Sequence, residues 1–66
     1  MTEQAPHSDH YKKLTPEPID VIEQWHLSFS LGNAVKYIAR CNHKGNKIAD
    51  LEKAIYYLQR EAQRWK

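Results

Sequence analysis

Four polar residues in the middle of the chain are spaced three and four positions apart: Asn33, Lys36, Tyr37 and Arg40. Residues at this spacing share one face of an α-helix. A guanidinium fork and an ammonium group bind phosphate oxygens, and a tyrosine ring offers a plane on which a base can stack. The spacing therefore predicts a helix face that can bind an anion.

A second group of residues comes shortly after the first. Asp50, Lys53 and Tyr57 share a face by the same spacing, and Lys44 lies in the turn between the two segments. A helix that starts after this turn adds unpaired backbone N–H groups, which favour anions. We expect both faces to line one cleft. The alternative is that these cations are only solvated and that the tyrosines rim the core.

The N-terminal segment is polar, and Pro6, Ser8 and Asp9 in it discourage regular structure. We expect residues 1–15 to form a flexible arm and residues 16–66 to form a helical domain. Within the arm, His10 and Tyr11 precede two lysines, and this group can close over a nucleotide. Tails of this composition are also often merely solvated, so both interpretations stay open.

A short first helix is expected to begin near Pro18, because proline suits the first helical position. Asp20 lies in the first turn, where the helix dipole favours a carboxylate. The apolar stripe of this helix is formed by Ile19, Ile22 and Trp25. The helix is expected to end near His26.

The second helix is expected from about residue 31 to residue 41, with Ser30 as its N-cap. Its apolar stripe consists of Leu31, Ala34, Val35 and Ile38. Leu27 and Phe29, in the connection before the helix, are expected to fill the core. Gly32 lies early in the helix, where a missing side chain permits close approach by another backbone or a ligand.

The third helix is expected from about residue 48 nearly to Lys66, with Asn46 as its N-cap and Gly45 left-handed before it. Its apolar residues are spaced 3, 4, 3, 4 and 3: Ile48, Leu51, Ile55, Leu58, Ala62 and Trp65. This heptad seam exceeds what two short helices can cover. The sequence therefore predicts an all-α, three-helix domain that oligomerises through its long last helix. Trp65 is expected between chains, and the alternative is that it folds back over its own domain.

The length of the chain favours oligomerisation, and its charge distribution favours an anionic ligand. A chain of 66 residues forms one domain and buries only about 60% of the surface that its unfolded form exposes. The single cysteine, Cys41, excludes an internal disulfide, so subunit contacts are the expected supplement. Residues 1–30 hold two lysines and five acids, whereas residues 31–66 hold eight lysines and arginines and three acids. The basic half favours a phosphate-bearing ligand.

Several other classes of protein do not fit the sequence. No apolar run has the length of a signal peptide or a membrane span, so we expect a cytoplasmic protein without a membrane partner. Phosphate loops of the G-x-x-x-x-G-K-[ST] and G-x-G-x-x-G types, H-E-x-x-H and paired cysteines are all absent. The carboxylates and histidines are scattered, which argues against a metal site. The cations are not massed at the start of a recognition helix, which argues against DNA binding.

Five blocks of the sequence resemble a known family: HY at 10–11, EPIDVIE at 17–23, LGNAVKYIAR at 31–40, KG at 44–45 and DLEKAIYYL at 50–58. In this order they look like the small bacteriophage family DUF3310, also called SaV-like, and the likeness covers about residues 10 to 61. One member of that family is a nucleotide kinase without a Walker loop. Another sensitises its host to an abortive-infection system, through a host protein.

The resemblance implies a phage protein in the cytoplasm of an infected host cell that binds a nucleotide or a nucleotide-derived phosphate ligand. The family blocks fall on the residues that spacing brings together: His10, Tyr11, Asn33, Lys36, Tyr37, Arg40, Lys44, Asp50 and Lys53. A kinase activity would require ATP and magnesium, and whether this chain is an enzyme stays open. The alternative function is an interaction module that engages a host defence protein or sequesters a nucleotide signal.

Overall fold

The computed structural model describes residues 14–43 and 45–66. This part of the chain forms three helices and no strand: α2 (Pro18–Gln24), α3 (Phe29–Arg40) and α4 (Lys47–Arg64). The all-α prediction is confirmed, and the last helix is the longest. The expected flexible arm lies almost entirely outside the described residues, as do His10, Tyr11 and Lys44.

Helix α2 begins where the sequence predicted, with Pro18 in the first turn and Asp20 beside it. It ends at Gln24, two residues before the expected position, because His26 adopts a left-handed conformation with φ of 54°. The N–H of His26 donates to the carbonyl of Glu23, and the N–H of Leu27 donates to the carbonyl of Ile22. These two bonds form a Schellman motif. Glycine usually marks this motif, so a histidine there gave no sequence signal.

Helix α3 begins two residues earlier than expected. The hydroxyl of Ser28, not of Ser30, accepts the capping bond from the N–H of Leu31, at 3.1 Å. Ser30 is instead buried inside the helix, so the predicted N-cap is wrong. Both serines can cap, and the earlier start places the small side chains of Ser30 and Ala34 against α4.

The expectation that Phe29 fills the core is also wrong, since its side chain is 77% exposed. The earlier helix start gives Phe29 a place in the first turn of α3, five residues before buried Ala34 and so about 140° away around the helix. Leu27 is half-buried, which agrees with its expected position beside the core.

Helix α4 agrees with the sequence at its start. The side chain of Asn46 accepts a hydrogen bond from the N–H of Ala49 at 2.9 Å, and Gly45 has a φ of 38°. The cap predicted at Asn46 is therefore confirmed. The helix ends at Arg64, and Trp65 follows as its C-cap.

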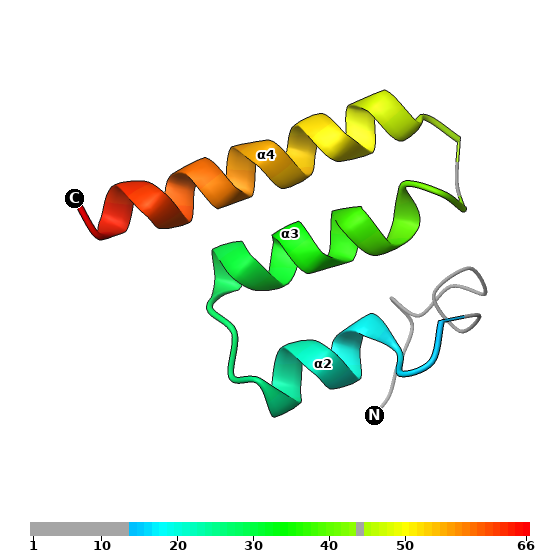
Figure 1. Cartoon of the computed structure of the whole chain (residues 1–66), viewed down its shortest axis with the longest axis horizontal. Helices are drawn as coiled ribbons and strands as arrows, with labels where there is room; N and C mark the ends of the chain where they lie inside the picture. Colours follow the sequence, from blue (N-terminus) through cyan, green and yellow to red (C-terminus); the bar gives the residue numbers. More distant parts are fainter. Residues whose placement is uncertain (1–13, 44) are drawn as a thin grey trace.

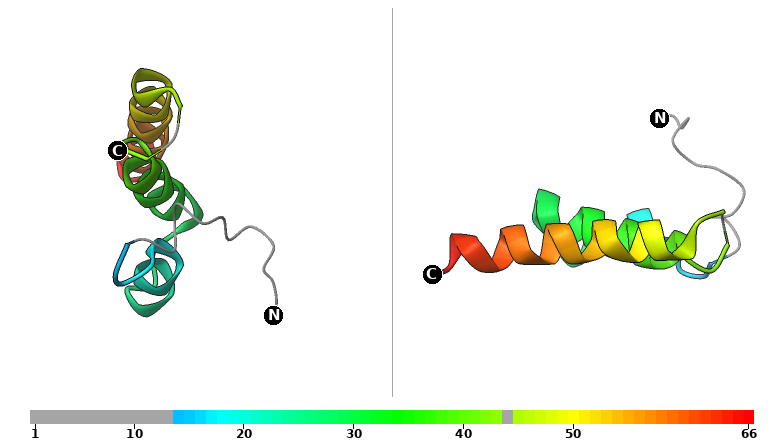
Figure 2. Two further views of the ribbon diagram at one scale, coloured as in Figure 1. Left: turned by 90° about the vertical axis from the view of Figure 1, so that its right-hand side faces the viewer. Right: turned by 90° about the horizontal axis from the view of Figure 1, so that it is seen from above.

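The three helices lie side by side in one layer, with α3 in the middle (Figures 1 and 2). The molecule measures 36 × 27 × 18 Å, and its shortest dimension is about one and a half helix diameters. Small residues let the helices approach: Ala34 and Ala54 are buried between α3 and α4. A Cβ at Gly32 would stand only 3.1 Å from the Ile22 side chain of α2, so the group that approaches Gly32 is a side chain, not the backbone or ligand that was expected. No helix of the described residues covers either broad face of the layer.

One carboxylate joins the C-terminal half of α4 to the start of α3. Glu61 accepts a hydrogen bond from the hydroxyl of Ser28 at 2.8 Å and another from the indole N–H of Trp65 at 3.0 Å. Arg64 forms an ion pair with it at 3.7 Å. The hydrogen bond from Trp65, then that from Ser28, and the charge of Arg64 lower the pKa of Glu61 from its usual 4.5, against a smaller opposing effect of burial.

This lowered pKa predicts a pH dependence of stability. A carboxyl whose pKa is lower in the folded state stabilises the fold above the unfolded pKa and loses this contribution as pH falls through the folded pKa. Glu61→Gln should therefore lower the melting temperature at pH 7, and the difference from wild type should shrink below about pH 4.5. Circular dichroism melts from pH 3 to pH 7 measure this. A difference that does not change with pH would contradict the assignment.

Candidate functional site

The predicted cationic residues of α3 and α4 meet around one tyrosine ring. The ammonium nitrogens of Lys36 and Lys53 lie 4.6 Å and 5.3 Å from the centre of the Tyr37 ring. The guanidinium carbon of Arg40 lies 5.8 Å from the same centre. Lys53 comes from α4 and the other residues from α3, so the antiparallel pairing of the two helices assembles the group. Their spacing on separate helices correctly predicted this convergence.

Aromatic rings extend the group along α4. Tyr37 and Tyr57 stack nearly parallel, with centroids 6.1 Å apart and 8° between the planes. Phe29 and Tyr56 each meet Tyr57 edge to face, at 6.1 Å and 5.1 Å. We call the surface formed by Lys36, Tyr37, Arg40, Lys53 and Tyr57 the cation–tyrosine face. Its rings hold the cations in place at a modest cation–π gain.

Asp50 takes a different place from the one expected. It is only 4% exposed, and its carboxylate lies 3.5 Å from the Nε of Arg40. That Nε is itself buried and has no hydrogen bond, so the ion pair is its compensation. A buried carboxylate turned toward Arg40 can hold the guanidinium, and its burial argues against the ligand contact that spacing suggested. Asp50 is best described as a residue that positions Arg40.

The two lysines differ from Arg40 in their charge environment. Within residues 14–43 and 45–66, neither Lys36 nor Lys53 has an ion pair. Three cations therefore surround Tyr37, and one carboxylate compensates only Arg40. This leaves a net positive charge beside an aromatic plane, which attracts a phosphate.

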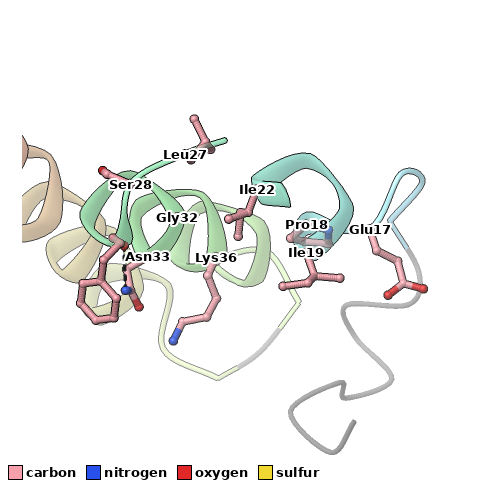
Figure 3. Close-up of a pocket in the computed structure, with 10 residues that line it drawn as sticks. Glu17, Pro18, Ile19, Ile22, Leu27, Ser28, Gly32, Asn33 and Lys36 are labelled. Atoms are coloured by element: carbon pink, nitrogen blue, oxygen red, sulfur yellow. Dashed lines mark hydrogen bonds between the residues drawn. The ribbon is translucent and has the colours of Figure 1, made fainter. Parts of the chain in front are cut away.

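An apolar cavity of about 280 Å³ borders this face (Figure 3). It lies between α2 and α3, and its polar lining consists of Glu17, Ser28, Asn33 and Lys36. Its apolar lining is formed by Pro18, Ile19, Ile22, Leu27, Phe29 and Gly32. Lys36 thus belongs to both the cavity and the cation–tyrosine face. This cavity was not predicted from the sequence, because the apolar spacing of α2 indicates only a packing stripe.

Asn33 is placed by the cavity rather than by Tyr37. Its amide N–H donates to the carbonyl of Phe29 at 2.9 Å, and the side chain lines the cavity. The residues predicted from sequence therefore divide into three groups. Lys36, Tyr37, Arg40 and Lys53 form one face, Asn33 borders the cavity and Asp50 is buried. His10, Tyr11 and Lys44 lie outside the described residues.

Cys41 is 8% exposed at the C-cap of α3, as expected for a small apolar residue. Among the described residues, no group of three or more histidines, cysteines or acids is arranged to hold a metal ion. Within the same part of the chain, no helix is long and apolar enough to cross a membrane.

Comparison with known proteins gives one match. The chain matches no curated protein and no solved structure. The family model described as protein of unknown function DUF3310 matches residues 5–59, which include α2, α3 and most of α4. This range holds every residue of the cation–tyrosine face and of the cavity. The chain belongs to the DUF3310 family.

Proposed function

We propose that this chain is a phage protein of the SaV-like type whose cation–tyrosine face binds the phosphate of a nucleotide. The observation that carries the proposal is the convergence of Lys36, Arg40 and Lys53 on Tyr37, with a carboxylate facing only Arg40. Cations held this close together repel one another, and an anion between them relieves that repulsion. A solvated helix surface would not require residues from two helices to meet.

The two lysines supply mobile point charges, and Arg40 supplies a fixed fork. Asp50 faces the Nε of Arg40, so the other N–H donors of the guanidinium are left for phosphate oxygens. Because Asp50 faces only the Nε of Arg40, this buried acid can lie beside a phosphate site without repelling the phosphate. The acid keeps Arg40 at the ring and neutralises only one of three charges.

We assign the base of the nucleotide to the apolar cavity. Lys36 stands between the cavity and the ring, so a ligand that holds its phosphate on Lys36 can place its apolar part between α2 and α3. From the sequence, Tyr11 or Tyr37 is expected to stack against the base, and Tyr11 lies outside the described residues. Tyr57 already stacks on Tyr37, which makes the cavity the better supported place.

Turnover would add phosphoryl transfer to this binding. In that case ATP and magnesium would be the co-substrate and the metal, and Lys36, Arg40 and Lys53 would offset charge on the transferred group. A deoxynucleoside monophosphate with ATP and magnesium would then yield a diphosphate.

The second candidate function is docking to a host defence protein. The observation in its favour is the high exposure of aromatic side chains that contribute little to the fold, Trp25 at 68% and Phe29 at 77%. Aromatic side chains of this kind often anchor protein interfaces. Docking of this type does not need the cations around Tyr37.

Titration calorimetry with a panel of mono-, di- and cyclic nucleotides tests the proposal. Nucleotide binding predicts saturable heat for at least one member of the panel, and an affinity that falls as salt is raised from 50 to 300 mM, because the contacts are ionic. Absence of heat across the panel, with a host protein that co-purifies with the chain, would favour the docking function instead.

A further inference from the structure

Large apolar side chains gather on the side of the layer opposite the cation–tyrosine face. Successive residues of a helix are turned by about 100°. On α3, this rotation places Leu31, Val35 and Ile38 within a narrow arc, roughly opposite Tyr37. On α4, it places Leu51, Ile55 and Leu58 away from Lys53 and Tyr57. The ring contacts of Tyr37 and Tyr57 fix which side is which.

This second side is exposed to a degree that is unusual for aliphatic residues. Ile38, Ile55 and Leu58 are 51%, 52% and 45% exposed, and Ile48 and Trp65 continue the row toward the two ends of α4 at 65% and 79%. The indole N–H of Trp65 bonds to Glu61 of its own helix, yet most of the ring surface stays exposed. We call the surface formed by Leu31, Val35, Ile38, Ile48, Leu51, Ile55, Leu58 and Trp65 the apolar face. A contiguous patch of this kind marks an association surface.

We propose that the apolar face packs against the same face of a second copy of this chain, with the two α4 helices antiparallel. A helix layer with one apolar side must bury it against another layer, and nothing else in the described chain covers this side. The layer measures 36 × 27 Å, which accommodates the roughly 800 Å² per partner that a stable interface uses. A two-fold pair uses the same patch twice, so its two apolar surfaces match.

Charges along α4 favour the antiparallel arrangement. Glu52 lies on the outer flank of the apolar face near the start of α4, and Lys66 follows the end of the helix. An antiparallel pair sets Glu52 of one copy against Lys66 of the other, and it also opposes the helix dipoles. A parallel pair would instead bring together two C-terminal ends that each carry Arg60, Arg64 and Lys66 with one acid, Glu61.

The dimer has a consequence for the ligand site. With the apolar faces buried, the two cation–tyrosine faces look outward on opposite sides of the particle. Each copy then keeps a complete site of its own, and a dimer holds two ligands. The pairing itself does not depend on whether the ligand is a nucleotide.

Sedimentation equilibrium of the full chain tests the pairing. Wild type is expected at twice the chain mass of 7.8 kDa at micromolar concentration, and Ile55→Glu with Leu58→Glu is expected at the single mass. The matched control is Tyr56→Glu with Gln63→Glu. It adds two acids to exposed positions of the same helix away from the apolar face, and it should stay dimeric.

Two milder substitutions keep the test decisive if the double glutamate variant fails to fold. Ile55→Ser with Leu58→Ser should weaken the dimer at least 100-fold. It should also reduce the rise of melting temperature with protein concentration that the wild-type dimer shows. A wild type at the single mass, an assembly of more than two copies, or a dimer that survives the double glutamate change would each overturn the proposal. None of these readings involves a nucleotide, so they are independent of the proposed function.

Discussion

Replacement of Lys36 and Lys53 by alanine is expected to weaken nucleotide binding about 100-fold or more, because a hydrogen bond to a charged group contributes roughly 1.5–3 kcal/mol. These two side chains are the best choice for substitution. Both lie at the Tyr37 ring, and neither has an ion pair within the described residues, so the fold does not rely on their charge. Titration calorimetry of the double variant against the tightest ligand of wild type measures the loss.

The matched control removes the same two charges elsewhere. Arg64→Ala with Lys66→Ala changes the net charge equally at the C-terminal end of α4, where both residues are exposed. It should weaken binding only a few-fold, by reducing the overall field. Equal losses in the two double variants would show that total charge, rather than the cation–tyrosine face, attracts the ligand.

Asp50→Ala is expected to destabilise the fold strongly, by about 2–4 kcal/mol. Removing one partner of a buried ion pair leaves the other without compensation, and partial exposure of Arg40 reduces the usual cost of 3–5 kcal/mol. The Nε of Arg40 is buried without a hydrogen bond, so it depends on this carboxylate. For a chain of 66 residues such a loss is a large part of the total stability. Urea denaturation measures it.

A double substitution separates charge from packing. Asp50→Leu with Arg40→Met replaces both charges by apolar groups, and the stability should recover to within about 1 kcal/mol of wild type. The same variant should still bind more weakly, since Arg40 is gone. A double variant as unstable as Asp50→Ala would show that Asp50 matters through its own packing, and not through Arg40.

Local signals explain which elements could be predicted. The start of α2 at Pro18 and the cap at Asn46 depend on chemistry within one turn, and both are as expected. The end of α2 depends on His26 in a conformation that glycine usually takes. The start of α3 depended on a choice between two serines two residues apart. Tertiary packing against α4 decided that choice, and residue types alone do not show it.

In the candidate site, too, features that depend on helix spacing could be predicted and features that depend on tertiary packing could not. Spacing shows which residues share a helix face. It correctly grouped Lys36, Tyr37 and Arg40, and it correctly predicted that Lys53 lies near them. Spacing does not show depth, so the burial of Asp50 could not be predicted. The cavity could not be predicted either, because it forms between α2 and α3 beside the contact of Ile22 with Gly32, and this packing is tertiary.

The most direct test of the central claim is a two-dimensional NMR titration of the isotope-labelled chain with the tightest nucleotide of the panel. Nucleotide binding at the proposed place predicts the largest shift changes at Lys36, Tyr37 and Lys53, with smaller changes at Ile22 beside the cavity. It also predicts no change at Ile55 or Leu58 on the apolar face. Shifts confined to the apolar face, or no saturable shifts at millimolar nucleotide, would contradict it.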